Sequence, residues 1–157
     1  MKNVILVVSS FGMLVLGSCG NSEADLSAST QSNEKTEEAT PVPTDPMQNK
    51  GVGPISSLTL EAIDPALAES GKTLFEGKCS ACHKMDKRSV GPALDGITER
   101  RTPEWIMNMI LDPERMTKED PIASELLAEY MAPMANQSLT EDEARKILEY
   151  FRSNDNK

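Results

Sequence analysis

The chain has 157 residues, a formal net charge of −9 and only 4% aromatic residues. The negative charge repels nucleic-acid phosphates, and the low aromatic content argues against a stacking platform for bases. We therefore expect no nucleic-acid partner. Composition changes near residue 60, and residues 61–157 are long enough for one compact domain.

The N-terminus has the pattern of an export signal. Lys2 gives a short positive start, and residues 4–16 form an almost unbroken apolar stretch. Such a stretch is too short to span a bilayer comfortably but suits the core of a signal peptide. Leu16-Gly17-Ser18-Cys19 follows, and small residues before a cysteine resemble the lipobox of bacterial lipoproteins. We predict a lipoprotein signal peptide over residues 1–18 and lipidation of Cys19; the alternative is an ordinary secretory signal.

Residues 19–60 are poor in large apolar side chains and rich in Ser, Thr, Glu, Asn, Pro and Gly. This composition predicts a disordered segment. Two or more acyl chains on Cys19 would anchor the chain stably, and about 40 flexible residues have a root-mean-square span of roughly 35 Å. We expect a flexible tether, acting either as a leash between partners or as a passive spacer.

The first predicted helix begins at Asp64-Pro65, because Asp caps a helix well and Pro fits its first position. Its apolar face consists of Leu67, Gly71, Leu74 and Phe75. The helix is expected to end shortly before Cys79.

The sequence Cys79-Ser80-Ala81-Cys82-His83 follows this helix. Two cysteines separated by two residues, with histidine immediately after, form the attachment signature of c-type haem. On one helical turn, both thiols can reach the vinyl groups along one porphyrin edge, and His83 can place an imidazole nitrogen on the iron. We therefore predict one covalent haem c, attached to Cys79 and Cys82, with His83 as an iron ligand.

Three other interpretations of this motif are weaker. A closed zinc site needs four protein ligands, and only three remain here if Cys19 is lipidated. A thioredoxin-like pair needs a βαβ context, and no convincing strand is visible. A plain disulfide leaves His83 unexplained, although it is the single histidine of the chain.

Two helices are predicted in the middle of the domain. Thr102-Pro103 begins one helix, which is expected to end at Asp112-Pro113, and Asp120-Pro121 begins the next. Their apolar positions at helical spacing are Trp105, Ile106, Met109 and Ile110 in the first, and Ile122, Leu126, Leu127 and Tyr130 in the second.

The sixth iron ligand must come from another residue type, because the chain has one histidine. Methionine is the best candidate, since its thioether raises the reduction potential. Met134 lies in the non-helical stretch Ala132-Pro133-Met134-Ala135-Asn136, which can present a side chain inward. We predict Met134 as the ligand and keep Met131 as the alternative.

A terminal helix is predicted after Thr140, because Thr140 and Glu143 have the spacing of a capping box. Its apolar stripe consists of Ala144, Ile147, Leu148 and Phe151. Four helices without a convincing strand make the domain all-α.

With these features in place, the chain resembles bacterial class I (monohaem) cytochromes c of the lipoprotein type over about residues 62–153. The shared features are the first helix, the Cys79–His83 motif, Gly91-Pro92-Ala93-Leu94, the Pro133-Met134 loop and the terminal helix. The resemblance implies a fold of about four to five helices around one haem. It also implies a helix crossing that places Gly71 and Phe75 near Tyr150 and Phe151.

The resemblance implies roles for two further residues. Pro92 would offer its carbonyl to the second ring nitrogen of His83, which would fix the ligand. Trp105 would either reach a haem propionate or belong to the core, and both interpretations stay open. The family often has Met followed by Pro, whereas Ala135 follows Met134 here; this bears on the choice between Met134 and Met131.

With both axial positions filled, the iron has no open site for a substrate, so we expect one-electron exchange and no enzymatic activity. The leading hypothesis is a monomeric, lipid-anchored electron carrier on the periplasmic side of a bacterial membrane. Its donor would be a quinol-oxidising complex, and its acceptor a terminal respiratory reductase or oxidase. The alternatives are a five-coordinate haem sensor or peroxidase and a fixed haem subunit of a larger respiratory complex.

Basic residues cluster around the attachment motif, with only Asp86 opposing them. They are Lys78, Lys84, Lys87 and Arg88. This patch would either steer an acidic redox partner to the haem edge or be a solvated face.

Overall fold

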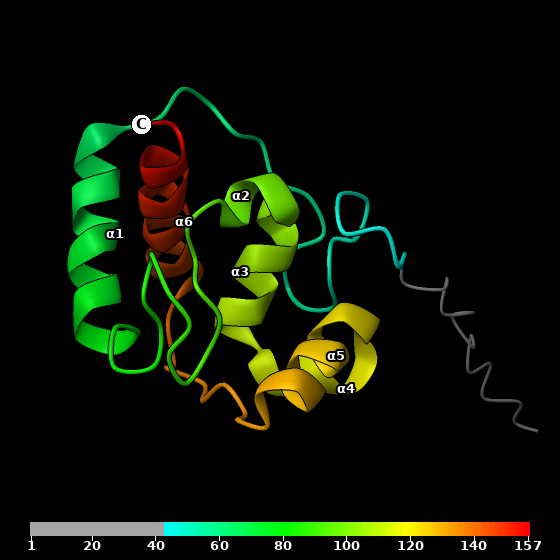
Figure 1. Cartoon of the computed structure of the whole chain (residues 1–157). Helices are drawn as coiled ribbons and strands as arrows, with labels where there is room; N and C mark the ends of the chain where they lie inside the picture. Colours follow the sequence, from blue (N-terminus) through cyan, green and yellow to red (C-terminus); the bar gives the residue numbers. More distant parts are fainter. Residues whose placement is uncertain (1–42) are drawn as a thin grey trace, which may run out of the picture. The chain divides into compact units, whose positions relative to one another are not determined.

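The structure is a computed structural model that describes residues 43–157 (Figure 1). This part of the chain contains no strand, so the predicted all-α fold is confirmed. Its helices are α1 (Pro65–Lys78), α2 (Ile97–Arg100), α3 (Pro103–Leu111), α4 (Pro113–Glu119), α5 (Pro121–Tyr130) and α6 (Glu141–Asp155). None of these helices has the length and apolarity needed to cross a membrane. The predicted signal peptide and Cys19 lie outside the described residues.

Capping residues followed by proline start four of the helices. The caps are Asp64, Thr102, Asp112 and Asp120, and each accepts a hydrogen bond from a backbone N–H of the first turn. Thr140 and Glu143 form the predicted capping box at the start of α6. The sequence analysis missed α4 because Asp112-Pro113 was interpreted only as the end of α3. The same dipeptide both ends α3 and starts α4.

Helices α1 and α6 lie side by side (Figure 1). At their crossing, a Cβ on Gly71 would lie 1.8 Å from the carbonyl oxygen of Lys146, so the two backbones are in direct contact. The Phe75 ring packs 5.6 Å from that of Tyr150 and 5.8 Å from that of Phe151. The helix crossing implied by the family resemblance is therefore present. Phe75 lies against Tyr150 and Phe151 as implied, whereas Gly71 meets α6 at Lys146, about one turn earlier.

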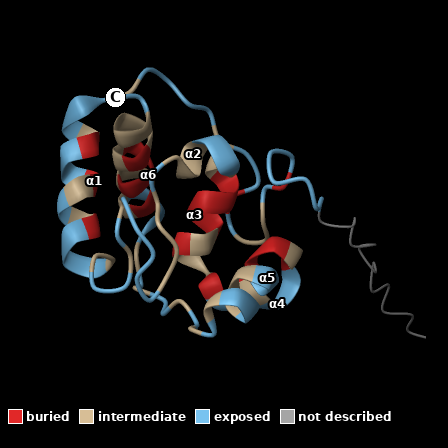
Figure 2. Cartoon of the chain, viewed as in Figure 1, coloured by how far each residue is buried: buried red, intermediate tan, exposed pale blue. Residues whose placement is uncertain are grey.

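The buried residues of α1, α3 and α6 form one core (Figure 2). Asp155, at the end of α6, holds the start of α2 against α6. Its carboxylate accepts hydrogen bonds from the Gly96 N–H at 2.8 Å, the Thr98 N–H at 3.0 Å and the Thr98 hydroxyl at 2.7 Å. This contact fixes the residues that lead from the 83–94 loop into α3.

The predicted flexible tether over residues 19–60 is wrong in its last part. Residues 49–58, which we call the strap, pack against α3 and α4. Asn49 and Ile55 are buried, and the Asn108 side chain accepts from the Ile55 N–H and donates to the Lys50 and Ile55 carbonyls. Amino-acid composition could not predict this packing, because the strap is held mainly by hydrogen bonds to its backbone N–H and C=O groups. Every residue has such groups, whatever its side chain.

Candidate haem-binding site

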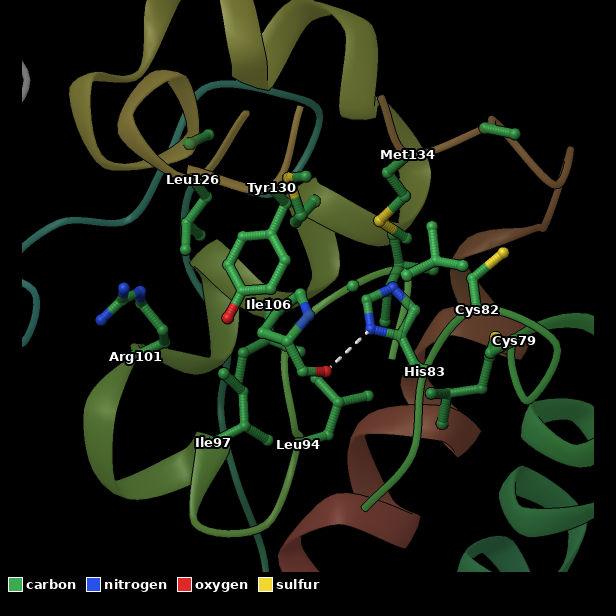
Figure 3. A pocket seen from close by; sticks show the side chains of 18 of the residues that line it. Cys79, Cys82, His83, Leu94, Ile97, Arg101, Ile106, Leu126, Tyr130 and Met134 are labelled. Carbon is green, nitrogen blue, oxygen red and sulfur yellow. Dashed lines mark hydrogen bonds between the residues drawn. The ribbon is translucent and has the colours of Figure 1, made fainter. Parts of the chain in front are cut away.

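A cavity of about 250 Å³ opens in the middle of the described domain (Figure 3). It is bordered by the end of α1, the 83–94 loop, α3, α5, the segment between α5 and α6, and α6 itself. Most of its wall is apolar, from residues that include Leu94, Ile97, Ile106, Ile110, Leu126 and Leu127. The cavity also collects Cys79, Cys82, His83, Pro92, Trp105 and Met134, so every predicted site residue of the domain borders it.

The two cysteines lie where α1 ends. Cys79 caps the helix, and its carbonyl accepts from the N–H of Cys82 at 3.1 Å and of His83 at 2.9 Å. This extra turn presents the motif to the cavity. The two thiols are not joined in a disulfide. Burial raises the pKa of the Cys79 thiol, and the opposing effect of Lys78 does not cancel it. Cys79 therefore lacks the lowered pKa of a reactive thiol.

The His83 ring is held from two sides. Its Nδ1 lies 3.2 Å from the Pro92 carbonyl oxygen, the contact expected from the resemblance (Figure 3). Because a carbonyl only accepts, Nδ1 carries the hydrogen, which leaves the Nε2 lone pair free for a metal. Gly91 packs against the ring so closely that a Cβ there would lie 2.4 Å from Cε1. The glycine and the carbonyl together fix the tautomer and orientation of the imidazole.

Met134 and Met131 have different environments. Met134 borders the cavity, and its side chain extends toward the His83 ring (Figure 3). Met131 is 87% exposed, does not border the cavity and adopts a left-handed conformation at the end of α5. Met109 also borders the cavity, from α3, but packs against the core. Of the two methionines considered as ligands, the structure brings Met134 to the site.

These residues fit a covalently attached haem. Among the described residues, no group of three or more His, Cys, Asp or Glu side chains could hold a bare metal ion, which leaves the zinc interpretation without support. An apolar cavity with one free imidazole nitrogen, a thioether and two thiols matches the donor set of a c-type haem.

Comparison with known proteins also indicates a protein with covalently attached haem. The family model for cytochrome c matches residues 68–155, which is more than half of the chain. The chain belongs to the cytochrome c family. It holds one covalently bound c-type haem with its iron. Membership of this family supports the role of a haem-based electron carrier.

Three relatives illustrate the likeness. Cytochrome c from Rhodothermus marinus is 43% identical, with a TM-score of 0.65, over 66% of this chain and 90% of its own. An engineered form of it, Rma TDE, is 42% identical, also with a TM-score of 0.65, over 67% and 92% of the two chains. Cytochrome c-551 of Stutzerimonas stutzeri is 48% identical over 40 residues, which are 25% of this chain and 38% of that curated relative.

In this cytochrome c, the role of Trp105 as a propionate partner is not supported. Its ring is 4% exposed and borders the cavity, but its Nε1–H donates to Asp120 Oδ1 at 3.1 Å. Tryptophan has only this one donor, so none remains for a propionate. The core alternative is the one the structure shows.

The predicted basic patch is partly neutralised. The Arg88 guanidinium lies 4.0 Å from the centre of the Tyr130 ring and 3.2 Å from a Glu129 carboxylate oxygen. The Lys84 ammonium donates to the Ser80 carbonyl at 2.6 Å. Arg88 therefore joins the loop after the attachment motif to the end of α5.

The sequence analysis missed several wall residues. Ile97 comes from the unpredicted α2, whereas Leu126 and Tyr130 were predicted only as apolar positions of a helix. The sequence did contain a signal for two of them. The apolar face of the helix that became α5 has to be buried, and the predicted haem site is a surface against which it can pack.

Proposed function

We propose that this chain is a one-electron carrier in which His83 and Met134 would ligate the haem iron, and Cys79 and Cys82 would hold the haem covalently. The observation that carries the proposal is that one cavity gathers these four side chains and leaves Met131 in solvent. When bound, the haem supplies a one-electron couple and the protein sets its potential and docking.

Each residue has a distinct part in this proposal. The thiols of Cys79 and Cys82 anchor the group at the exposed edge of the site, His83 offers Nε2, and Pro92 keeps the imidazole in the required tautomer. Met134 offers a thioether, which favours the reduced state. The apolar wall excludes water, and two protein ligands leave no open position for a substrate.

We propose further that lipidated Cys19 anchors the carrier on the periplasmic side of a bacterial membrane. The apolar residues 4–16 and the Leu16–Cys19 motif support this. A quinol-oxidising complex would be the donor and a terminal reductase or oxidase the acceptor. An acidic partner fits Lys78, Lys84 and Lys87, while Arg88 is engaged by Glu129.

The test is the visible spectrum of the full chain made with haem-attachment machinery. We expect low-spin bands and, in the oxidised protein, the weak long-wavelength sulfur-to-iron band. Met134→Ala should abolish that band, and the matched variant Met131→Ala should keep it. A high-spin spectrum of the unmodified protein, or loss of the band in Met131→Ala alone, would overturn the His–Met proposal. Cys19→Ala should move the protein from the membrane to the soluble fraction.

A further inference from the structure

A buried carboxylate lies directly behind the wall of the haem cavity. Asp120, at the start of α5, is 1% exposed. Its Oδ1 accepts from Trp105 Nε1 at 3.1 Å and from the Ala123 N–H at 2.8 Å, and its Oδ2 accepts from Asn49 Nδ2 at 2.6 Å. Buried acidic side chains are rare unless they are paired, so this one requires an explanation.

The hydrogen bonds indicate that Asp120 is ionised. It accepts from three N–H donors, and no acceptor faces it that would need a proton from the carboxyl. The orientation of the Asn49 amide is also fixed, because Asn49 Oδ1 accepts from the Gly51 N–H at 2.6 Å, which leaves Nδ2 for Asp120. The Arg101 guanidinium interacts electrostatically with Asp120 and lies 5.1 Å from the centre of the Trp105 ring.

Trp105 connects this carboxylate to the cavity. The indole ring borders the cavity while its N–H points at Asp120. The Asn49 carbonyl accepts from the Thr102 hydroxyl at 2.6 Å, and that hydroxyl caps the first turn of the helix that carries Trp105. The strap, the start of α5 and the cavity wall thus form one hydrogen-bonded unit.

We propose that Asp120 is a positioning residue that sets the reduction potential of the haem. Asn49 of the strap offsets part of the electrostatic effect of the Asp120 carboxylate on that potential. This deepens the proposed electron-carrier function and rests on it. The carboxylate holds the indole in the cavity wall and places a negative charge in a low-dielectric region next to the redox group. Negative charge favours the ferric state, and the Asn49 amide dipole offsets part of that charge.

The proposal predicts shifts of opposite sign. Asp120→Asn removes the charge and should raise the potential. Asn49→Ala removes the compensating donor and should lower it. Coulomb interactions over about 10 Å at an effective dielectric constant of about 20 change an equilibrium roughly tenfold. We therefore expect a change of at least about threefold in the ferrous-to-ferric ratio for Asp120→Asn, which is about 30 mV for one electron, and a smaller opposite change for Asn49→Ala.

The chain provides matched controls for both variants. Asp112 is also an N-cap aspartate followed by proline, at the start of α4. Its side chain accepts from the Arg115 N–H, whereas that of Asp120 accepts from the indole of a residue that lines the cavity. Asn108 is also fully buried and also holds the strap, through Lys50 and Ile55, but has no bond to Asp120. Asp112→Asn and Asn108→Ala should leave the potential unchanged.

The experiment measures the reduction potential of the full haem-loaded chain and its four variants by spectroelectrochemistry, together with hydrogen exchange at the indole N–H. Opposite shifts with silent controls, and faster indole exchange in Asp120→Asn, support the proposal. Shifts of the same sign, no shift, or an equal shift in a control overturn it. If Asp120→Asn does not yield a folded protein, the shift in reduction potential of Asn49→Ala tests the proposal alone. A lower potential supports the proposal, and an unchanged or higher potential overturns it. A failed His–Met spectrum in the unmodified protein would instead count against the proposed function.

Discussion

Gly91 shows how one missing side chain fixes the candidate iron ligand. A Cβ at this position would lie 2.4 Å from His83 Cε1, 2.8 Å from Nδ1 and 3.0 Å from Nε2, so any other residue must displace the ring. The Gly91 N–H also donates to the Cys82 carbonyl at 2.9 Å. The residue therefore joins the attachment motif to the loop that carries Pro92.

We predict that Gly91→Ala turns the imidazole away from Pro92 and weakens the bond that His83 would make to the haem iron. Overpacking of this kind costs about 1–3 kcal/mol of folding stability. The measurements are the yield of covalent haem, the long-wavelength band and the free energy of unfolding. Gly77→Ala is the matched control, because a Cβ at Gly77 meets nothing within 4 Å; it should leave the spectrum unchanged and the helix equally or more stable. An unchanged spectrum in Gly91→Ala would show that the ring has room to move.

At the scale of elements, the contact between α1 and α6 depends on the absence of a side chain at Gly71. Its Cβ would fall 1.8 Å from the Lys146 carbonyl oxygen, a backbone atom that cannot move aside alone. We predict that Gly71→Ala separates the two helices and destabilises the domain by about 2–3 kcal/mol, whereas Gly77→Ala in the same helix does not. Denaturant unfolding of both variants measures the difference; equal stabilities would mean that the crossing is loose.

The tie between α2 and α6 should give a pH-dependent contribution to stability. Burial raises the pKa of Asp155, but hydrogen bonds from the Thr98 hydroxyl, the Thr98 N–H and the Gly96 N–H lower it more, so it lies below its ordinary value of 3.8. A carboxyl with a depressed folded-state pKa stabilises the fold above the unfolded value and loses this effect as pH falls through the folded value.

Asp155→Asn should therefore cost stability at neutral pH, by about 1 kcal/mol or less because the group is largely solvent-screened. The difference from the unmodified chain should shrink as pH falls below 3.8. Urea unfolding across that range measures it. A difference that stays constant down to the acid limit would mean that the carboxylate charge plays no part.

Features that depend on neighbouring residues could be predicted from the sequence, and those that depend on distant contacts could not. The Cys79–His83 motif, the helix starts at Asp64 and Thr140 and the apolar stripe of α6 all follow from local spacing. The partner of the Trp105 N–H could not be predicted, because Asp120 is 15 residues away. Nor could the burial of Asn49, whose bond to Asp120 spans 71 residues.

For the whole molecule, the strap changes where the folded unit begins. If the tether starts at Cys19 and ends near residue 48, it has about 30 residues and a root-mean-square span of roughly 30 Å. The reach of the domain from a membrane would then be shorter than for a tether that ends at residue 60.

We predict that replacing residues 49–58 with a Gly/Ser segment of equal length lowers the free energy of unfolding by about 2–4 kcal/mol. The strap buries Ile55 and satisfies the buried Asn108; one buried aliphatic side chain contributes about 1.5–3 kcal/mol and each hydrogen bond about 1 kcal/mol, less the cost of ordering the segment. The matched control replaces residues 33–42, which lie outside the described residues and within the predicted tether, and should leave unfolding of the haem-loaded domain unchanged. Equal effects of the two replacements would contradict a strap that is part of the fold, because a tether contributes to reach but not to stability.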